Sequence, residues 1–170
     1  MQQPDGFGEF VAVRSPALLR TAWLLTGNWA SAEDLVQVAL AKTWRRWRRL
    51  AQPDLAEAYV RRVIVTSYAT DRRRRWHGEV PTAELPDRAS PADAYADSDW
   101  RAAVALALGD LPRRQRAVVV LCYFDDLTEA EAARQLGVAV GTVKSQKSKA
   151  LARLRAHPAL AEHPEEGVRP

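Results

Sequence analysis

Short polar and cationic side chains recur at helical spacing in the stretch between Val140 and Arg155. The set on one face comprises Thr142, Ser145, Gln146, Lys149 and Arg153. All of these side chains donate hydrogen bonds, and the base edges and phosphates of DNA accept them. We therefore expect this stretch to contact DNA directly, in the manner of a helix lying in the major groove.

A helix-turn-helix is predicted to position these donors. Thr128 is a natural N-cap, and Glu131 three residues later completes a capping box. The first helix should end at Leu136, since Gly137 favours the left-handed turn that closes a helix. The second helix should begin near Val140 and pack through one apolar face, consisting of Val140, Val143, Ala150, Leu151 and Leu154. The alternative is a helical hairpin that packs only on protein.

A second cationic surface is predicted where another helix ends. This helix is capped by Asp54 and Glu57 and should continue to about Trp76. Its core face is expected to consist of Val60, Val63, Ile64 and Tyr68, and its other face of Arg62, Thr66, Ala69 and Arg73. The run Arg72-Arg73-Arg74-Arg75-Trp76 suits phosphate binding and base stacking. A solvated helix end is the alternative, because cations also favour the helix C-terminus.

A third helix is predicted from the capping box Ser31–Asp34 to about Leu50. Its core face should comprise Val36, Leu40, Trp44 and Trp47, and an opposite polar stripe should comprise Asp34, Gln37, Ala41, Arg45 and Arg48. The stripe is acidic at its first turn and basic at its last. Read without context, it is either a solvated face or a surface for a protein partner.

Further helices are predicted before and after these. Phe7–Leu25 has helical apolar spacing, and Pro16 makes it either one kinked helix or two short ones, ended by Gly27-Asn28. Another helix should start near Asp97 or Ser98 with Trp100, Val104 and Leu108 inward. The next should open at Leu111-Pro112 and run through an apolar centre to about Phe124, ended by Asp125-Asp126. Strand signals are weak throughout.

Composition and charge separate two parts of the chain. Residues 77–99 carry six acidic residues and one arginine, net −5 in a chain of formal charge +4, which leaves +9 on the remainder. A basic body with an acidic, proline-containing connector suggests a polyanionic partner, although an arginine-rich composition alone would give the same balance. Cys122 is the single cysteine and lies in an apolar run, so we expect a buried structural thiol, and no disulfide or cysteine-based zinc site.

The expected fold is all-α, with two small helical domains joined by a flexible acidic linker. The predicted boundaries are 1–76 for the first domain, 77–99 for the linker, 100–156 for the helix-turn-helix domain and 157–170 for a disordered tail. The sequence shows no nucleophile–base pair, phosphate loop, metal cluster, membrane-spanning run or signal peptide. We therefore expect a cytoplasmic, non-enzymatic protein without cofactors.

Three stretches together resemble one family, the extracytoplasmic-function sigma factors of bacterial RNA polymerase, of the actinobacterial kind. They are Ala32-Glu33-Asp34-Leu35-Val36-Gln37 followed by Trp44, the Tyr59–Arg75 helix, and Leu111-Pro112-Arg113-Arg114-Gln115 leading to Gly141-Thr142-Val143-Lys144-Ser145. The resemblance covers roughly residues 7–155. It implies sigma region 2-like and region 4-like domains, which bind core RNA polymerase and direct transcription initiation at promoters.

The resemblance also implies roles for individual residues. Asp34, Leu35, Gln37, Ala41 and Arg45 would bind the clamp helices of the largest polymerase subunit. The Ala51–Leu55 loop and the following helix would recognise and open the −10 element, using Tyr59, Arg61, Arg62, Thr66, Arg72, Arg73, Arg74, Arg75 and Trp76. The second domain would lie near the polymerase flap region and read the −35 element with Thr142, Lys144, Ser145, Gln146, Ser148, Lys149 and Arg153.

Two positions depart from the family pattern. Family members often have Asn where this chain has Thr66, and Ser at the recognition-helix N-cap where this chain has Ala139. An anti-sigma factor that holds the protein inactive would be a typical partner.

The main rival interpretation is a conventional helix-turn-helix regulator, which would need a sensor domain in place of the basic helices in residues 7–76. The third interpretation is a helical scaffold that only binds protein.

Overall fold

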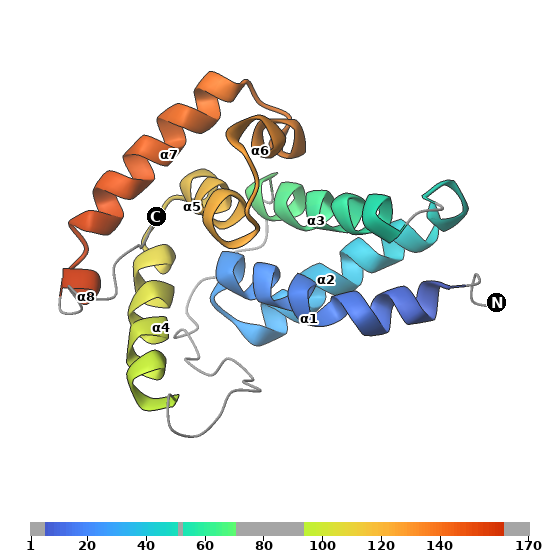
Figure 1. The fold of residues 1–170 in the computed structure, drawn as a ribbon, viewed down its shortest axis with the longest axis horizontal. Coiled ribbons are helices and arrows are strands. Elements are labelled where there is room, and N and C mark those ends of the chain that lie inside the picture. Colours follow the sequence, from blue (N-terminus) through green and yellow to red (C-terminus); the bar gives the residue numbers. More distant parts are fainter. Residues whose placement is uncertain (1–5, 51–52, 71–93, 162–170) are drawn as a thin grey trace.

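The computed structural model describes residues 6–50, 53–70 and 94–161, and these residues form helices and the turns between them (Figure 1). The N-terminal unit contains α1 (Phe7–Thr26), α2 (Trp29–Trp44), the short 3-10 helix η1 (Trp47–Arg49) and α3 (Pro53–Thr70). The C-terminal unit contains α4 (Ala94–Gly109), α5 (Arg113–Val119), the π-helical turn η2 (Val120–Phe124), α6 (Glu129–Leu136), α7 (Val140–Arg155) and α8 (Pro158–Ala161). The predicted all-α class is confirmed.

The N-terminal unit packs α1, α2 and α3 around large apolar side chains that exclude water. Trp23 and Leu25 from α1 and Ile64 from α3 are among its fully buried residues. The predicted core face of α3 is confirmed, because all four of its side chains are buried. Pro16 lies within a single continuous α1, and Gly27, with φ of +71°, ends that helix through a bond from its N–H to the Trp23 carbonyl.

The predicted bounds of α2 were wrong at both ends. Asn28 is the N-cap, since its side-chain oxygen accepts from the Ser31 N–H at 2.9 Å, and Ser31 itself is buried inside the helix. The helix ends at Trp44, short of the predicted Leu50. Beyond it, Trp47 turns back onto Phe7 and Phe10, with ring centroids 5.0 and 5.1 Å apart. This aromatic contact directs the chain out of the α2 axis.

The helix-turn-helix of the C-terminal unit forms largely as predicted. Thr128 and Glu131 make the reciprocal capping box, and Gly137 closes α6 in the left-handed conformation with φ of +67°. Val143 is fully buried in α7, as expected. Val140 was wrongly placed on the packing face: it is 40% exposed because it lies in the first turn of α7, at the open corner of the motif.

Three further predictions need correction. Helix α4 begins at Ala94, inside the segment assigned to the linker. Residues 158–161, assigned to the tail, form α8, which packs against α4; just before α8 and just after α4, His157 Nε2 lies 3.1 Å from Asp110 Oδ2. Cys122 is half-buried, not fully buried. The rest of the predicted linker and tail, residues 77–93 and 162–170, lies outside the described residues.

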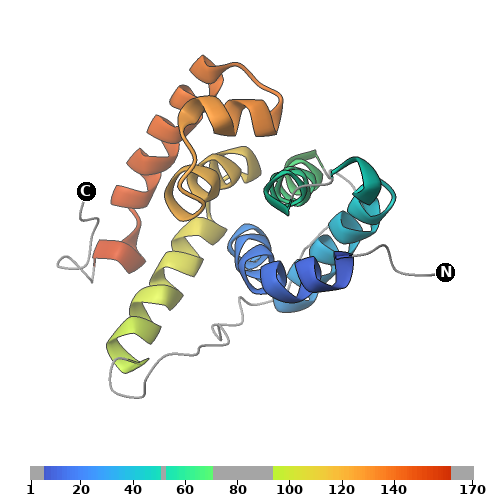
Figure 2. The same cartoon turned by 45° about the vertical axis from the view of Figure 1, so that its right-hand side comes forward.

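The two units pack against each other. Helix α3 lies beside α5 and α6, and α1 contacts α4, α5 and η2 (Figures 1 and 2). The apolar core continues through this boundary, since it joins Ile64 and Val65 of α3 to Val118 and Leu121 of the C-terminal unit. The two candidate nucleic-acid surfaces are therefore held in one fixed arrangement in this structure.

Candidate nucleic-acid interface

The outer face of α7 presents the predicted donors to solvent. Six of the seven side chains proposed for the −35 element are exposed and Gln146 is half-buried; the exposed ones are Thr142, Lys144, Ser145, Ser148, Lys149 and Arg153. Beneath them, Val143 and Ala150 are fully buried against the core. A helix anchored by one face and lined with donors on the other fits the major groove.

Lys147 fixes α7 against α6, a role that the sequence patterns did not reveal. Its Nζ lies 2.6 Å from the Glu129 carboxylate and 5.9 Å from the centre of the Tyr123 ring. The hydrogen bond with Lys147 lowers the pKa of Glu129, and the same bond raises the pKa of Lys147. The pair therefore links α7 to the start of α6.

The start of α7 lacks a side-chain cap. Ala139 is its N-cap residue and makes no side-chain hydrogen bond to the first turn. The backbone compensates in part, because the Ala139 carbonyl accepts from Thr142 N at 2.9 Å. At the other end of the helix, Arg153 Nη1 donates to Gln115 Oε1 of α5 at 3.1 Å, so one of the predicted DNA-contacting arginines is also a packing residue.

The polar stripe of α2 lies on the surface of the N-terminal unit. Asp34, Gln37, Ala41 and Arg45 are exposed and Leu35 is half-buried. We refer to these five residues as the α2 stripe. Arg48, which the sequence analysis placed on the same face, belongs to η1 and not to α2. Val38, 38% exposed, adds apolar surface on the same helix.

Helix α3 divides the predicted −10 residues between two environments. Arg62 is exposed, while Thr66 is half-buried and its Oγ1 donates to the Arg62 carbonyl at 2.6 Å. Tyr59 is half-buried beneath the Arg46 guanidinium, which lies 5.5 Å from its ring centre. Arg61, in contrast, points toward the C-terminal unit. The predicted residues Arg72 to Trp76 lie outside the described residues.

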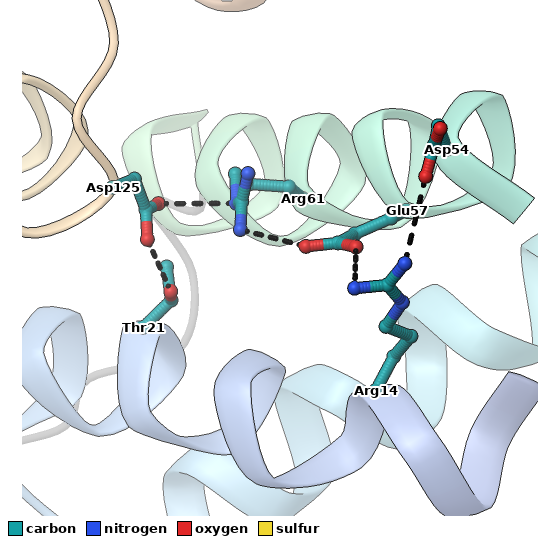
Figure 3. A network of polar contacts seen from close by, with 6 residues as sticks. All are labelled: Arg14, Thr21, Asp54, Glu57, Arg61 and Asp125. Atoms are coloured by element: carbon teal, nitrogen blue, oxygen red, sulfur yellow. Dashed lines mark hydrogen bonds and ion pairs between the residues drawn. The ribbon is translucent and has the colours of Figure 1, made fainter.

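Arg61 takes part in a network of ion pairs and hydrogen bonds that joins the two units (Figure 3). Its Nη2 lies 3.0 Å from Glu57 Oε1 and its Nε lies 3.3 Å from Asp125 Oδ2. The second Asp125 oxygen accepts from Thr21 Oγ1 at 2.8 Å. We call Thr21, Arg61 and Asp125 the interdomain latch. From the sequence, Asp125 is expected only to end a helix, because nothing local to it indicates partners so distant in the chain.

The attraction between Arg61 and Asp125 does not fully offset the cost of burying the Asp125 charge. The side chains of Arg61 and Asp125 are 18% and 6% exposed. Burial raises the pKa of Asp125 more than the nearby Arg61 and the Thr21 hydrogen bond lower it. Arg61 Nε and Asp125 Oδ2 are buried and, within the described residues, neither has a partner in hydrogen-bond geometry. The ion pair thus favours this particular pairing of the two units but adds little to the free energy of folding.

Two further arginines cross the boundary between the units. Arg116, 8% exposed, donates through Nη1 to the Leu25 carbonyl at 2.7 Å and through Nη2 to the Gly109 carbonyl. Burial lowers the pKa of Arg116. Arg113 Nη1 donates to the Tyr68 carbonyl at 3.3 Å and lies over the Tyr68 ring, 5.1 Å from its centre. The predicted motif around Gln115 therefore serves interdomain packing.

The described residues hold neither a candidate metal site nor a candidate membrane span. None of their His, Cys, Asp and Glu side chains gather in a group of three or more that could hold a metal ion. In the same part of the chain, no helix combines the length and the apolar character needed to cross a membrane.

Comparison with known proteins gives one consistent result. Residues 10–78 match the model described as sigma-70 region 2, and residues 101–154 match sigma-70, region 4. The chain is 43% identical over 149 residues to an RNA polymerase sigma-E factor of Streptomyces avermitilis, covering 88% of this chain and 83% of that protein. It is 34% identical over 143 residues to the ECF RNA polymerase sigma factor SigL of Mycobacterium tuberculosis, covering 81% and 80%.

Solved structures have the same fold. The sigma factor RpoE, in complex with the anti-sigma factor NepR from Bartonella quintana, superposes with a TM-score of 0.67 at 24% identity, covering 90% of this chain and 96% of that one. CnrH, in complex with the cytosolic domain of CnrY, superposes with a TM-score of 0.61 at 26% identity, covering 88% and 85%.

Proposed function

The chain belongs to the extracytoplasmic-function sigma factors of the sigma-70 family, and from this premise we propose how its surfaces divide the work of promoter recognition. As a sigma factor it binds core RNA polymerase and directs promoter-specific initiation of transcription. The polymerase supplies the chemistry of RNA synthesis, and this chain supplies specificity. Its place of action is the cytoplasm, where the polymerase works.

The −35 element is read by α7. The observation that carries this assignment is the pairing of a fully buried Val143 with the exposed donors Thr142, Lys144 and Ser145 around it. Lys144 and Lys149 contribute phosphate attraction that is independent of sequence, while the shorter donors suit base edges. Ser148 and Arg153 lie further along the same helix and extend the contact toward the DNA backbone.

The α2 stripe binds the polymerase clamp helices. Its exposed Asp34 and Gln37 lie on α2 and its Arg45 is the C-cap residue of that helix, so the stripe runs from a negative to a positive charge along the surface offered to a partner helix. The exposed Val38 beside them gives apolar area that a protein interface would cover. The flap region of the polymerase is the corresponding partner of the C-terminal unit.

The −10 element is recognised and opened by α3 and the residues after it. Opening requires a base to leave the stack at a cost of a few kcal/mol, which contacts to the extruded strand must offset. Arg62 is exposed on α3 and Thr66, one turn later, is half-buried; the run Arg72 to Trp76 follows them in the sequence. Tyr59 and Arg61 complete the proposed surface.

The two DNA-binding units, which we call the two readers, should each bind DNA weakly, and they become specific when both are held on one polymerase. Joining two short sites raises the effective concentration of the second reader once the first is bound. An anti-sigma factor is included among the proposed partners, supported by the similar RpoE, which was solved with NepR. Such a partner would compete with polymerase for these surfaces.

Binding to core polymerase tests this proposal against the conventional-regulator alternative. The purified chain is passed over a gel-filtration column with bacterial core enzyme, with Glu33→Ala as the matched control for Asp34→Ala. A sigma factor co-elutes with core, the Asp34 variant co-elutes less, and the Glu33 variant behaves as the wild type. Absence of co-elution for the wild type would favour a regulator that binds DNA alone.

A further inference from the structure

The contact between Asp125 and Arg61 sets an acid of the C-terminal unit against a cation of the −10 helix. An arginine fork binds a carboxylate and a phosphate through the same donors. In this structure the Nε of Arg61 faces Asp125 at 3.3 Å and its Nη2 faces Glu57 at 3.0 Å. A DNA phosphate that binds Arg61 through Nε and Nη2 would therefore have to replace Asp125 and Glu57.

We propose that Asp125 is an intramolecular phosphate mimic that closes the free sigma factor on itself by occupying Arg61 through the interdomain latch. This inference rests on the proposed role of Arg61 at the −10 element. In the closed state the two readers are fixed relative to each other and Arg61 is withheld from DNA. Release of Asp125 frees Arg61 and lets the two units separate onto polymerase and promoter.

The structure shows why the latch is releasable. Asp125 gains one hydrogen bond from Thr21, whereas its other oxygen is buried without a partner in hydrogen-bond geometry among the described residues. Burial of that carboxylate outweighs the attraction of Arg61, as the raised pKa of Asp125 indicates. A cleft of about 190 Å³ lies beside it and is lined in part by Arg20, Leu24 and Phe124, so the latch lies next to a space at the boundary of the two units.

Closure is measured directly on the full chain. Spin labels are placed at Val13→Cys on α1 and Ala152→Cys on α7, both exposed, in a Cys122→Ser background. Pulsed electron resonance then gives the distance distribution between the two units. We expect one narrow distribution in the parent chain, and a broad, longer one in Asp125→Lys and in Arg61→Glu, because each change places like charges in contact.

The double variant Arg61→Glu/Asp125→Lys controls for misfolding, since it restores opposite charges and should return the narrow distribution. The far-ultraviolet circular dichroism of each variant is recorded alongside. A broad distribution in the parent, or a narrow one in both single variants, would overturn the latch. Failure of the double variant to recover closure would show that charge pairing does not control the arrangement, and would overturn it as well.

A second measurement tests the competition for Arg61. Binding of fluorescent single-stranded oligothymidine is compared in Asp125→Lys and in Asp99→Lys, an exposed α4 position with the same charge change. We expect the Asp125 variant to bind about fivefold more tightly than the Asp99 variant, because it adds a released arginine to the shared charge effect. Equal binding in an opened chain would overturn the phosphate mimicry. Co-elution of the parent chain with core polymerase is a separate measurement, so failure of the sigma assignment is distinguished from failure of the latch.

Discussion

Asp125 Oδ2 lies 3.3 Å from Arg61 Nε, and this pair joins the chain beside the helix-turn-helix to the helix proposed to open the −10 element. The contact links residues of two units that would have to act at two separate DNA sites. Its geometry combines a satisfied oxygen on Thr21 with an unsatisfied one facing Arg61. In the proposal above, this contact adds to the apolar packing between the two units and is the part of their boundary that a competing phosphate can replace.

Acidification should stabilise the wild type through Asp125. Because its pKa is raised in the folded chain, the folded state binds a proton more tightly than the unfolded state does. The gain therefore appears as pH falls through the raised folded pKa and is complete below the ordinary aspartate value of about 4. Arg61 and Glu57 from α3, Arg20 and Thr21 from α1, and Asp126 surround this carboxyl.

Asp125→Asn isolates that contribution. The variant should be within about 1 kcal/mol of the wild type at neutral pH, because a neutral amide avoids the burial of charge while retaining an acceptor for Thr21. As the pH is lowered, the wild type should gain unfolding free energy relative to the variant. Urea unfolding at a series of pH values measures it, and a pH-independent difference would contradict the raised pKa.

Arg116→Ala should destabilise the junction of the two units. The change leaves the Leu25 and Gly109 carbonyls without their guanidinium donor, and we expect a loss of about 2–4 kcal/mol of unfolding free energy. Arg114→Ala on the same helix is the matched control, since Arg114 is exposed. Thermal unfolding followed by circular dichroism distinguishes the two, and equal melting temperatures would refute the structural role of Arg116.

The two N-caps of the helix-turn-helix should respond in opposite directions. Thr128→Ala removes a capping box and should cost about 1 kcal/mol, whereas Ala139→Ser supplies the absent cap of α7 and should add about 1 kcal/mol. The Thr128 hydrogen bonds lower the pKa of Glu131, so their stabilisation is present above the ordinary glutamate range and is lost as pH falls through the lowered value. Chemical unfolding at neutral and acidic pH checks both statements.

Variants of Lys147 and Lys149 should distinguish a role in positioning α7 from a direct contact with DNA. Both substitutions to Ala remove one positive charge from α7, so both should weaken DNA binding and reduce its salt dependence. Only Lys147→Ala also breaks the Glu129 bridge, and it should lower the melting temperature while Lys149→Ala does not. Differential scanning calorimetry provides the first readout and fluorescence anisotropy the second. An equal melting temperature in both variants would remove the positioning role.

The helix-turn-helix was predictable because its signals are local. Thr128, Glu131 and Gly137 each act within a turn of their own position, and the structure uses them as predicted. The α2 start was missed because Asn28 and Ser31 are both good caps, and local sequence does not decide between them. Trp47 turns away from the predicted helix because its aromatic partners come from α1, a tertiary preference that local helical spacing does not show.

The interdomain latch was not predictable from the same patterns. Thr21 and Asp125 are separated by 104 positions, and each has an ordinary local explanation as a helix residue or a helix end. Arg61 was assigned to DNA by the family resemblance, in which cationic side chains of this helix hold the backbone of the opened strand. Its position at the boundary between the two units depends on how α3 packs against α5 and α6, which composition and periodicity do not specify.

Transcription in vitro tests the central claim most directly. The purified chain is added to bacterial core polymerase over a pool of promoter fragments, in parallel with Asp34→Ala, Lys144→Ala and the control Glu33→Ala. We predict initiation from a subset of fragments that depends on the chain. Initiation should be reduced by Asp34→Ala through weaker core binding and by Lys144→Ala through weaker −35 contact, with Glu33→Ala unchanged. Absence of chain-dependent initiation on every fragment would contradict the account.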